Sequence, residues 1–291
     1  MKITIGSRTS QLARWQAGQF IELLARQGHE VEWKGIQTKG DLDQKTPLDA
    51  FGERGVFTKA IDLAVLNGEI DVAVHSLKDC PSVLPEELHF AAVLKRDFYE
   101  DVLVHKAGFS FHKRNTIATS SSRRKAQWLA QYPNSDIVDV RGNVDSRLQK
   151  FNQSHWDGMI LSRAGLERLG AMPLHFQILD WMVPAPTQGM MAAYTASSNK
   201  TLNLILKNIE DPETRFAADL ERNFMRIVEM KCNAPVAAHA GFLNKTDLRF
   251  RAEVYAADGR NIFRETVILK KIEAVMEVER LANEAKMQLN G

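Results

Sequence analysis

A carboxylate and a thiol stand side by side where an apolar run ends, in the stretch AVHSLKDCPS at residues 73–82. The run gives way to Ser76, Lys78, Asp79 and Cys80. Open α/β sheets place their chemistry at such strand ends, where polar side chains leave the buried sheet. A carboxylate can move protons, and a thiol can act as a nucleophile. Asp79 and Cys80 are therefore the first candidates for catalysis.

Arginines and hydroxyl side chains gather at two expected helix starts. Arg8 and Ser10 precede one helical pattern, and Ser121, Arg123 and Arg124 open another. Free N–H groups at a helix N-terminus favour anions, and guanidinium forks hold carboxylates with two hydrogen bonds. The set continues with Thr119, Arg141, Arg147 and Arg168. A single arginine of this kind would simply be solvated, but the repetition predicts an anion-binding cleft.

Several other chemistries find no motif in the sequence. It contains no Walker-type glycine loop and no G-x-G-x-x-G, so phosphate is not favoured over carboxylate. No G-x-S-x-G nucleophile elbow accompanies His75 and Ser76, and a structural histidine is the simpler interpretation. The eight histidines show no metal-ligand spacing, so we expect no metal.

The charge balance argues against nucleic acid and membrane partners. Among 291 residues, 38 basic and 36 acidic side chains leave a net charge of +2, with no sustained basic block. No apolar run approaches the roughly 18 residues of a membrane span, and the start MKITIGSRTS lacks a signal-peptide core. Cys80 and Cys232 form no metal or redox motif, which indicates reduced thiols and a cytoplasmic protein.

The elements that would position these residues occur twice. Residues 3–17 and 115–130 each give a strand, a hydroxyl-rich turn with arginine and a helix. Residues 54–76 and 141–162 each give Arg-Gly, a helical pattern, an aspartate and a strand that ends in serine. Two matches in the same order predict two similarly built α/β lobes.

Three domains are expected from these patterns. Lobe 1 comprises residues 1–95 with about 190–208, and lobe 2 comprises residues 96–189. Within lobe 1, the polar stretch 38–56 is either a long surface loop or a mobile lid over a cleft. Residues 211–291 change to a helix, a β-hairpin and a closing helix, which predicts a small α+β domain.

Taken together, these segments resemble the hydroxymethylbilane synthase family, also called porphobilinogen deaminases. The matching motifs run in the family's order from residue 5 to about residue 190. They are SRTSQLARWQA, IQTKGD, GVFTKAIDLAVLNGEIDVAVHSLKDCP, TSSSRRKAQWLA, VRGNVDSRL, SRAGLERLG and VPAPTQGM. The loop around Cys232 extends the resemblance into the third domain.

The resemblance implies a transferase that joins four porphobilinogen molecules head to tail, releases ammonia and yields hydroxymethylbilane for tetrapyrrole and heme biosynthesis. It also implies a dipyrromethane cofactor, held by a thioether to one cysteine. The family fold has two lobes like those of periplasmic binding proteins, a central cleft, and a small C-terminal α+β domain that carries the cofactor cysteine. Porphobilinogen would be the small-molecule substrate, and the protein would be a monomer.

The resemblance also assigns roles to individual positions. Asp79 matches the catalytic aspartate, whose carboxylate would stabilise positive charge on a pyrrole nitrogen, and Cys232 matches the cofactor-bearing cysteine. Cys80 stands where the family usually has an apolar residue, so we expect a small packed side chain. The residues expected to bind cofactor or substrate are Arg8, Ser10, Gln16, Phe57, Ser76, Lys78, Thr119, Ser121, Arg123, Arg124, Arg141, Arg147, Arg168 and Gln188.

The sequence departs from the family pattern outside the catalytic set. Met230 and Lys231 precede Cys232 where glycines are usual, and PTQGMMAAYTASSN replaces a more usual Gly-Gln-Gly-Ala run. The alternative to the enzyme is a non-catalytic two-lobed binding protein for an anionic small molecule. The lobes alone would allow this alternative, but the domain around Cys232 would then have no purpose.

Overall fold

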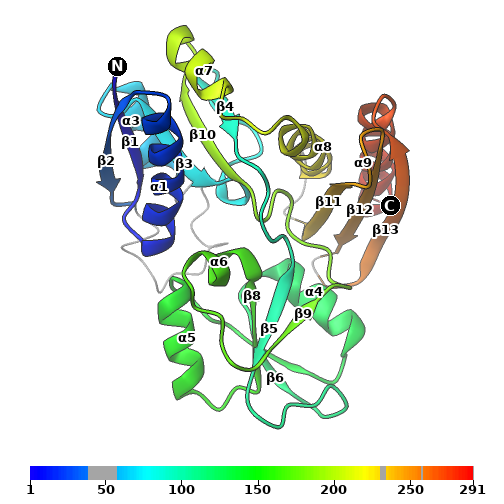
Figure 1. The fold of residues 1–291 in the computed structure, drawn as a ribbon. Helices are drawn as coiled ribbons and strands as arrows, with labels where there is room; N and C mark the ends of the chain where they lie inside the picture. Colours follow the sequence, from blue (N-terminus) through cyan, green and yellow to red (C-terminus); the bar gives the residue numbers. More distant parts are fainter. Residues whose placement is uncertain (39–57, 230–233, 257, 291) are drawn as a thin grey trace. The chain divides into compact units, whose positions relative to one another are not determined.

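The computed structural model describes residues 1–38, 58–229, 234–256 and 258–290 (Figure 1). The chain divides into two compact units. The first unit contains Met1–Asp97 and Gly189–Arg215, and the second contains Phe98–Gln188 and Phe216–Gly291.

The first unit, lobe 1, is a five-stranded mixed sheet with flanking helices. Its elements are β1 (Lys2–Arg8), α1 (Gln11–Arg26), β2 (Glu30–Ile36), α3 (Lys59–Leu66), β3 (Val72–Ser76), the 3-10 helix η2 (Leu77–Asp79), β4 (Leu88–Val93), β10 (Met191–Ala196) and α7 (Lys200–Lys207). The strand order is β2-β1-β3-β10-β4. Strand β1 pairs in parallel with β2 and β3, whereas β10 runs antiparallel to β3 and β4.

Lobe 2, which lies in the second unit, repeats this plan. Its elements are β5 (Asp101–His105), β6 (Thr116–Ala118), α4 (Ser122–Gln131), β7 (Asp136–Val138), α5 (Val144–Gln153), β8 (Gly158–Ser162), α6 (Arg163–Arg168) and β9 (Phe176–Leu179). The order is β7-β6-β8-β5-β9, with β6 parallel to β7 and β8, and β5 antiparallel to β8 and β9. Matching β6 to β1 and β5 to β10 makes the strand order and strand directions of the two sheets identical, which confirms the predicted duplication.

A three-stranded antiparallel sheet follows in the chain. Its elements are α8 (Pro212–Glu229), β11 (Val236–Phe242), β12 (Asp247–Tyr255), β13 (Asn261–Lys270) and α9 (Ala274–Asn290). Strand β12 is central, and α9 packs against β12 and β13 (Figure 1). The predicted order of helix, hairpin and closing helix is confirmed, and so is the mixed α/β fold of two lobes with a small C-terminal domain.

An aspartate at the start of a matched strand makes the same contacts in both lobes. Asp71 Oδ2 accepts the Thr4 N–H at 2.7 Å, and the Asp71 N–H donates to the Thr4 carbonyl at 2.9 Å. Asp157 makes the same pair of bonds with Thr116, at 2.8 and 3.0 Å. Each carboxylate therefore fixes the register between parallel strands, and the repeated aspartate of the sequence has a structural role in both copies.

The first helix of each lobe begins at a serine cap. Ser10 Oγ accepts the Ala13 N–H at 3.3 Å, and Ser121 Oγ accepts the Arg124 N–H at 3.4 Å. Both serines have extended backbone angles, as expected at an N-cap. Because each cap closely follows a strand, the residues just before it lie at the carboxyl end of β1 or β6.

Apolar packing fixes these elements. In lobe 1, helix α1 buries Phe20 and Leu24 in a core that also contains Ile3 and Ile5 of β1. In lobe 2, the fully buried Trp128 of α4 belongs to one of two clusters that enclose the sheet. Burial of these large side chains against the sheets holds the strand ends in place.

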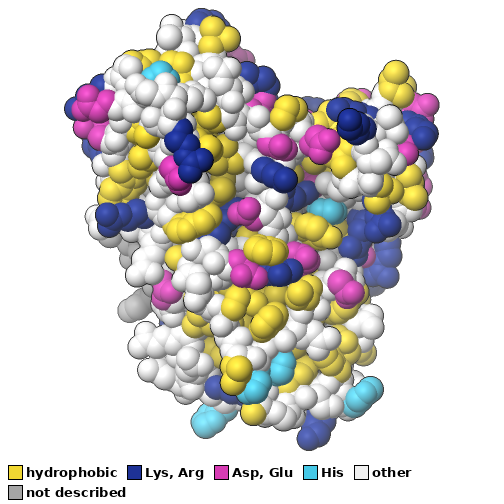
Figure 2. Space-filling model, in the orientation of Figure 1, with side chains coloured by type: hydrophobic (Ala, Val, Ile, Leu, Met, Phe, Trp, Pro, Cys, Tyr) yellow, Lys and Arg dark blue, Asp and Glu magenta, His cyan; other side chains and the backbone are white. Residues whose placement is uncertain are grey.

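The surface carries both signs of charge. On the face shown in Figure 2, Lys and Arg side chains are interspersed with Asp and Glu, in keeping with 38 basic and 36 acidic residues. Within the described ranges, no helix has both the length and the apolar character needed to cross a bilayer.

Candidate active site

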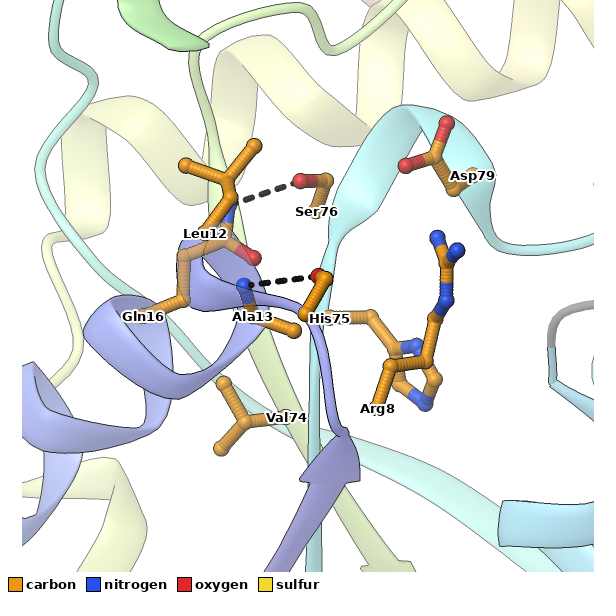
Figure 3. Close-up of a pocket in the computed structure, with 9 residues that line it drawn as sticks. Arg8, Leu12, Ala13, Gln16, Val74, His75, Ser76 and Asp79 are labelled. Carbon is orange, nitrogen blue, oxygen red and sulfur yellow. Dashed lines mark hydrogen bonds between the residues drawn. The ribbon is translucent and has the colours of Figure 1, made fainter. Parts of the chain in front are cut away.

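A pocket in lobe 1 brings five of the predicted site residues together (Figure 3). It is lined by Arg8, Ser10, Leu12, Ala13, Gln16, Val74, His75, Ser76 and Asp79. Arg8 ends β1, Ser76 ends β3, and Asp79 ends η2. The pocket therefore lies where β1 and β3 end, as the polar strand ends in the sequence predict.

The wall of the pocket is held by a buried amide. Gln16 of α1 is 2% exposed, and its Nε2 donates to Ser76 Oγ at 2.7 Å. This hydrogen bond ties α1 to the end of β3. Both residues were expected to contact ligand, and the structure gives them a partner in each other.

The turn after β3 presents the candidate catalytic carboxylate. Lys78 and Asp79 lie in η2, and the side chain of Asp79 is exposed. Figure 3 shows the Arg8 side chain directed toward the side of the pocket where Asp79 lies. Cys80 follows at 5% exposure, with its Sγ 3.8 Å from the Ser76 carbonyl oxygen. The predicted packed role of Cys80 agrees with this burial, whereas Asp79 is accessible.

A buried histidine forms the floor of the same pocket. His75 stacks parallel to the Tyr194 ring, and its Nε2 lies 3.1 Å from the Tyr194 hydroxyl. That hydroxyl donates to Asp62 of α3, so its oxygen is left to accept a hydrogen bond from His75 Nε2–H. Burial lowers the pKa of His75 to about 3, and the charge of Arg8 adds to this effect. His75 is therefore a neutral imidazole beneath Arg8.

In lobe 2, the two arginines at the start of α4 converge on one carboxylate. Arg124 donates to Asp101 Oδ1 from Nη2 at 2.7 Å and from Nε at 3.1 Å. Arg123 Nη2 lies 2.8 Å from Asp101 Oδ2. Asp101, the first residue of β5, is 0% exposed, and the two arginines are 5% and 7% exposed. The helix start thus holds a buried anion from its own chain.

The electrostatics of this cluster depend on burial and on the neighbouring charges. Burial alone would raise the pKa of Asp101, but the guanidiniums of Arg123 and Arg124 outweigh it and hold that pKa well below its usual range. The Glu253 carboxylate also acts on Arg123 through its charge, so Asp101 is not the only anion near this guanidinium. Arg123 Nε is buried and has no hydrogen-bond partner among the described residues. The cluster therefore keeps one unused donor, which suits a carboxylate oxygen.

Other predicted residues of lobe 2 support this cluster or lie nearby in the chain. Gln188 Nε2 donates to Asp101 Oδ1 at 2.9 Å and to the Tyr99 carbonyl at 2.8 Å. Thr119 is buried just after β6, and its Oγ1 accepts the Ser121 N–H at 3.3 Å. These contacts explain why polar side chains recur around the helix start.

The remaining predicted arginines lie around α5 and α6. Arg141 precedes α5 and is half-buried. Arg147 lies within α5, and its Nε donates to the Gly142 carbonyl at 2.7 Å. Arg168 is the last residue of α6 and is 9% exposed. Arg141 and Arg147 thus lie on either side of the start of α5, as the sequence pattern predicts, while the ligand contacts of all three arginines stay predictions.

Three expectations lie outside the described residues. They are Phe57, Cys232 and the stretch 38–56, of which only Thr38 is described. Conversely, sequence reasoning missed Asp101 and Tyr194. The only signal for Asp101 was an acidic residue at the start of an apolar run, DVLVH, and Tyr194 looked like an ordinary core residue. Across the described part of the chain, no cluster of His, Cys, Asp and Glu could hold a metal ion.

Two family models match the chain in sequence. The model for the dipyrromethane cofactor-binding domain of porphobilinogen deaminase matches residues 3–203. The model for the C-terminal domain of porphobilinogen deaminase matches residues 216–287. The matches cover both lobes and the small C-terminal domain.

Curated relatives agree with these models over nearly full length. A porphobilinogen deaminase from Exiguobacterium is 39% identical over 91% of this chain and 89% of its own. A porphobilinogen deaminase from Desulforamulus reducens is 38% identical over 95% and 93%. A probable porphobilinogen deaminase from Methanocaldococcus jannaschii is 41% identical over 88% and 89%.

Among solved structures, the chain is similar to a probable amino-acid ABC transporter extracellular-binding protein from Bacillus subtilis. The TM-score is 0.46 at 10% identity, with 78% of this chain and 96% of the other covered. A likeness this distant says nothing about ligands. The family models and the curated relatives, in contrast, agree with each other and with the motifs quoted above. The chain belongs to the porphobilinogen deaminase family, whose members are transferases and whose substrate is porphobilinogen.

Proposed function

We propose that this chain joins four porphobilinogen molecules head to tail, with loss of ammonia, to give hydroxymethylbilane, and that Asp79 is its catalytic residue. The observation that carries the proposal is the lobe 1 pocket. An exposed carboxylate shares this pocket with Arg8, Ser10 and Ser76, which are groups that bind carboxylates. A substrate with both a pyrrole nitrogen and carboxylate side chains suits such a pocket.

Asp79 would act on the pyrrole nitrogen. When the aminomethyl group of porphobilinogen leaves as ammonia, positive charge develops on the ring nitrogen. A carboxylate beside that N–H stabilises the charge and can accept or return a proton. The backbone of η2 places Asp79 just after β3, at the edge of the pocket.

Cationic and polar side chains would bind the acetate and propionate groups. Arg8 would act in lobe 1, and Arg123 and Arg124, which both contact Asp101, would act in lobe 2. The unpartnered Nε of Arg123 supports a ligand oxygen there. The other proposed binding residues are Ser10, Gln16, Phe57, Ser76, Lys78, Thr119, Ser121, Arg141, Arg147, Arg168 and Gln188.

A dipyrromethane cofactor attached through a thioether to Cys232 would complete the enzyme. When bound, it supplies the pyrrole from which the chain grows. The donor set fits such a group, because a polypyrrole with acetate and propionate arms needs several fixed cations. Arg123 and Arg124 would hold its carboxylates, and Asp79 would face its N–H groups.

We further propose three domains, namely 1–95 with about 190–208, 96–189, and 211–291. The unit boundaries at Asp97 and Gly189 support the first two, and the match to residues 216–287 supports the third.

We also propose that the protein is a cytoplasmic monomer, an expectation that rests on the sequence and on the resemblance. The alternative of a non-catalytic binding protein is disfavoured by the family match over both lobes and the C-terminal domain.

Mass spectrometry of the intact, denatured protein tests the cofactor proposal. We expect two retained pyrrole units, their loss in Cys232→Ser and their retention in the matched variant Cys80→Ser. An Ehrlich colour reaction on the same samples should follow the mass. Retention in Cys232→Ser would refute the attachment site.

Porphobilinogen consumption by the purified holoenzyme tests the activity itself. We expect ammonia and hydroxymethylbilane to form. A protein that binds porphobilinogen without consuming it would favour the binding-protein alternative.

A further inference from the structure

The segment that leaves β9 and leads toward β10 is held from two sides within the second unit. On one side, the Val183 carbonyl accepts from Arg123 Nη1 and Gln127 Nε2, both at 2.8 Å, and the Val183 N–H donates to Gln127 Oε1 at 2.7 Å. On the other side, the Ala238 N–H of β11 donates to the Pro184 carbonyl at 3.2 Å. The segment thus joins α4 of lobe 2 to the C-terminal sheet.

A buried glutamate on α8 strengthens the second side. Glu221 is 0% exposed. Its Oε2 accepts the Thr187 N–H at 2.6 Å, and its Oε1 accepts the Ala240 N–H at 2.6 Å. Hydrogen bonds from N–H groups to a buried carboxylate are short and strong. One side chain therefore fixes the connecting segment and β11 to the same point of α8.

The backbone at Thr187 needs such support. Its φ of 61° lies in the left-handed region, which is unfavourable for a β-branched residue. The hydroxyl donates to the carbonyl of the preceding Pro186 at 2.7 Å. The bond from the Thr187 N–H to Glu221 adds a second restraint at the same peptide. Without it, the segment could relax toward an unstrained conformation.

The residue after Thr187 connects this restraint to the arginines. Gln188 donates to Asp101 Oδ1 at 2.9 Å, on the oxygen that also accepts two bonds from Arg124. The orientation of the Asp101 carboxylate therefore depends on where Gln188 lies. That orientation in turn sets the planes of both guanidiniums, because a fork-shaped donor follows the carboxylate it binds.

We propose that Glu221 is a positioning residue for the arginine pair, acting through Thr187, Gln188 and Asp101. The proposal rests on the proposed function, in which Arg123 and Arg124 bind substrate carboxylates. A purely structural role, in which Glu221 only joins α8 to β11, would leave the arginines as they are. The two roles differ in what happens at Arg124 Nε.

The test compares Glu221→Gln with Glu213→Gln in the holoenzyme. Glu213 lies on the same helix and is exposed, so its replacement removes the same charge without touching the segment. In Glu221→Gln, an amide N–H₂ replaces one acceptor and faces a backbone donor. We expect hydrogen exchange at Arg124 Nε–H, followed by NMR, to accelerate by about tenfold or more. The control should exchange like the wild type.

Kinetics with porphobilinogen provide the second measurement. We expect KM to rise about 5- to 20-fold in Glu221→Gln, with kcat within about twofold, since the arginines bind rather than react. In an Arg123→Lys background, the same replacement should raise KM much less, because both changes act through one cluster. Additive effects in this double-mutant cycle would overturn the proposal.

The outcomes separate this proposal from the function it rests on. Unchanged exchange at Arg124 in Glu221→Gln overturns the positioning role. Faster exchange with an unchanged KM supports the positioning contact but overturns the binding role of the arginine pair. Should Glu221→Gln fail to fold, Glu221→Asp keeps the charge but is too short to hold both N–H groups. It is expected to give the same faster exchange, and wild-type exchange in a folded Glu221→Asp overturns the proposal.

Discussion

Lobe 1 and lobe 2 share one strand order, yet the first helix of each lobe begins with different side chains, apolar in lobe 1 and positively charged in lobe 2. Ser10 and Ser121 cap α1 and α4 at equivalent positions. The second and third residues after the cap are a leucine and an alanine in lobe 1, but they are Arg123 and Arg124 in lobe 2. The same turn therefore begins an apolar helix face in one lobe and a cationic one in the other.

The antiparallel strand beside this turn differs in a matching way. Met191 of β10 pairs with Ser76 of β3, and Asp101 of β5 pairs with Ser162 of β8. Both Met191 and Asp101 are buried. An apolar side chain thus lies opposite the apolar helix face, and a carboxylate lies opposite the arginines. Each lobe is internally consistent, since a buried cation requires a buried partner.

At two other matched positions, the charged side chain belongs to lobe 1 and the uncharged residue to lobe 2. Asp79, three residues after Ser76, is exposed, whereas the equivalent position in lobe 2 is the buried Gly165. Arg8 stands two residues before its cap, where lobe 2 has Thr119. The two lobes therefore match in their strands and turns, but the charged side chains line a pocket in lobe 1 and are buried in lobe 2. This difference is what one expects if lobe 1 supplies the reacting group and lobe 2 supplies fixed positive charge.

Removing Asp79 should have the largest effect on this contrast. Asp79→Ala should fold normally, because the side chain is exposed, and should reduce kcat by about 100- to 10,000-fold, the range for a lost acid–base group. Steady-state assays of porphobilinogen consumption measure this. Cys80→Ala, at the adjacent buried position, is the control and should keep most of the activity. Near-normal turnover in Asp79→Ala would remove Asp79 from the mechanism.

Replacing Asp101 should have a large effect on stability. Asp101→Asn removes the carboxylate that both buried guanidiniums contact, and we expect a loss of about 3 to 5 kcal/mol in the free energy of unfolding. The equivalent change in lobe 1, Met191→Leu, conserves volume and polarity and should cost under about 1.5 kcal/mol. Urea unfolding of both variants measures the difference. Equal losses would mean that the ion cluster is not what distinguishes the lobes.

The two lobes should also respond differently to acid. His75 has a pKa of about 3 in the folded protein, well below the roughly 6.5 of an unfolded histidine. The unfolded state therefore binds more protons below about pH 6.5, and stability falls as the pH drops toward 3. At pH 5 the loss from this one group is about 2 kcal/mol. Asp101, whose pKa is lowered, keeps its full stabilising effect until the pH falls below about 3.9.

His75→Gln isolates this contribution, because glutamine can still donate to Tyr194 but cannot titrate. Between pH 7 and pH 5, the wild type should lose about 2 kcal/mol more than the variant in urea unfolding. Parallel stability curves for the two proteins would contradict the buried, neutral His75. In the Asp101→Asn variant, which keeps His75, the free energy of unfolding should fall between pH 7 and pH 5 as it does in the wild type.

Much of this fold could be predicted from the sequence because its signals are local. Apolar runs ending in polar groups gave the strand ends, and the matched aspartates Asp71 and Asp157 marked equivalent strands. The pocket residues Arg8 and Ser76 lie at such ends and were predicted individually. Their common pocket follows from β1 and β3 being neighbours in the sheet.

The lobe 2 cluster could not be predicted in the same way. Arg123 and Arg124 were identified as anion-binding, but their partner Asp101 comes from β5, which reaches its place in the sheet only through the antiparallel pairing with β8. Glu221 is further away still in the chain. Long-range pairs of this kind depend on topology, and no spacing in the sequence encodes them. The sequence pattern predicted carboxylate partners for Arg123 and Arg124, but it did not predict that Asp101 of the same chain would be one of them.

The smallest expected effect is the loss of a serine helix cap, which should be equal in the two lobes. Ser10→Ala and Ser121→Ala each remove the side-chain acceptor of one helix cap, at nearly equal hydrogen-bond lengths of 3.3 and 3.4 Å. Each should cost about 1 kcal/mol in the free energy of unfolding, measured by urea titration. The caps belong to the shared scaffold, so their losses should match even though their neighbours differ in charge. A much larger loss for Ser121→Ala would mean that the cap also orients the arginines. Ser121 would then belong to the binding site of lobe 2 as well as to the scaffold that both lobes share.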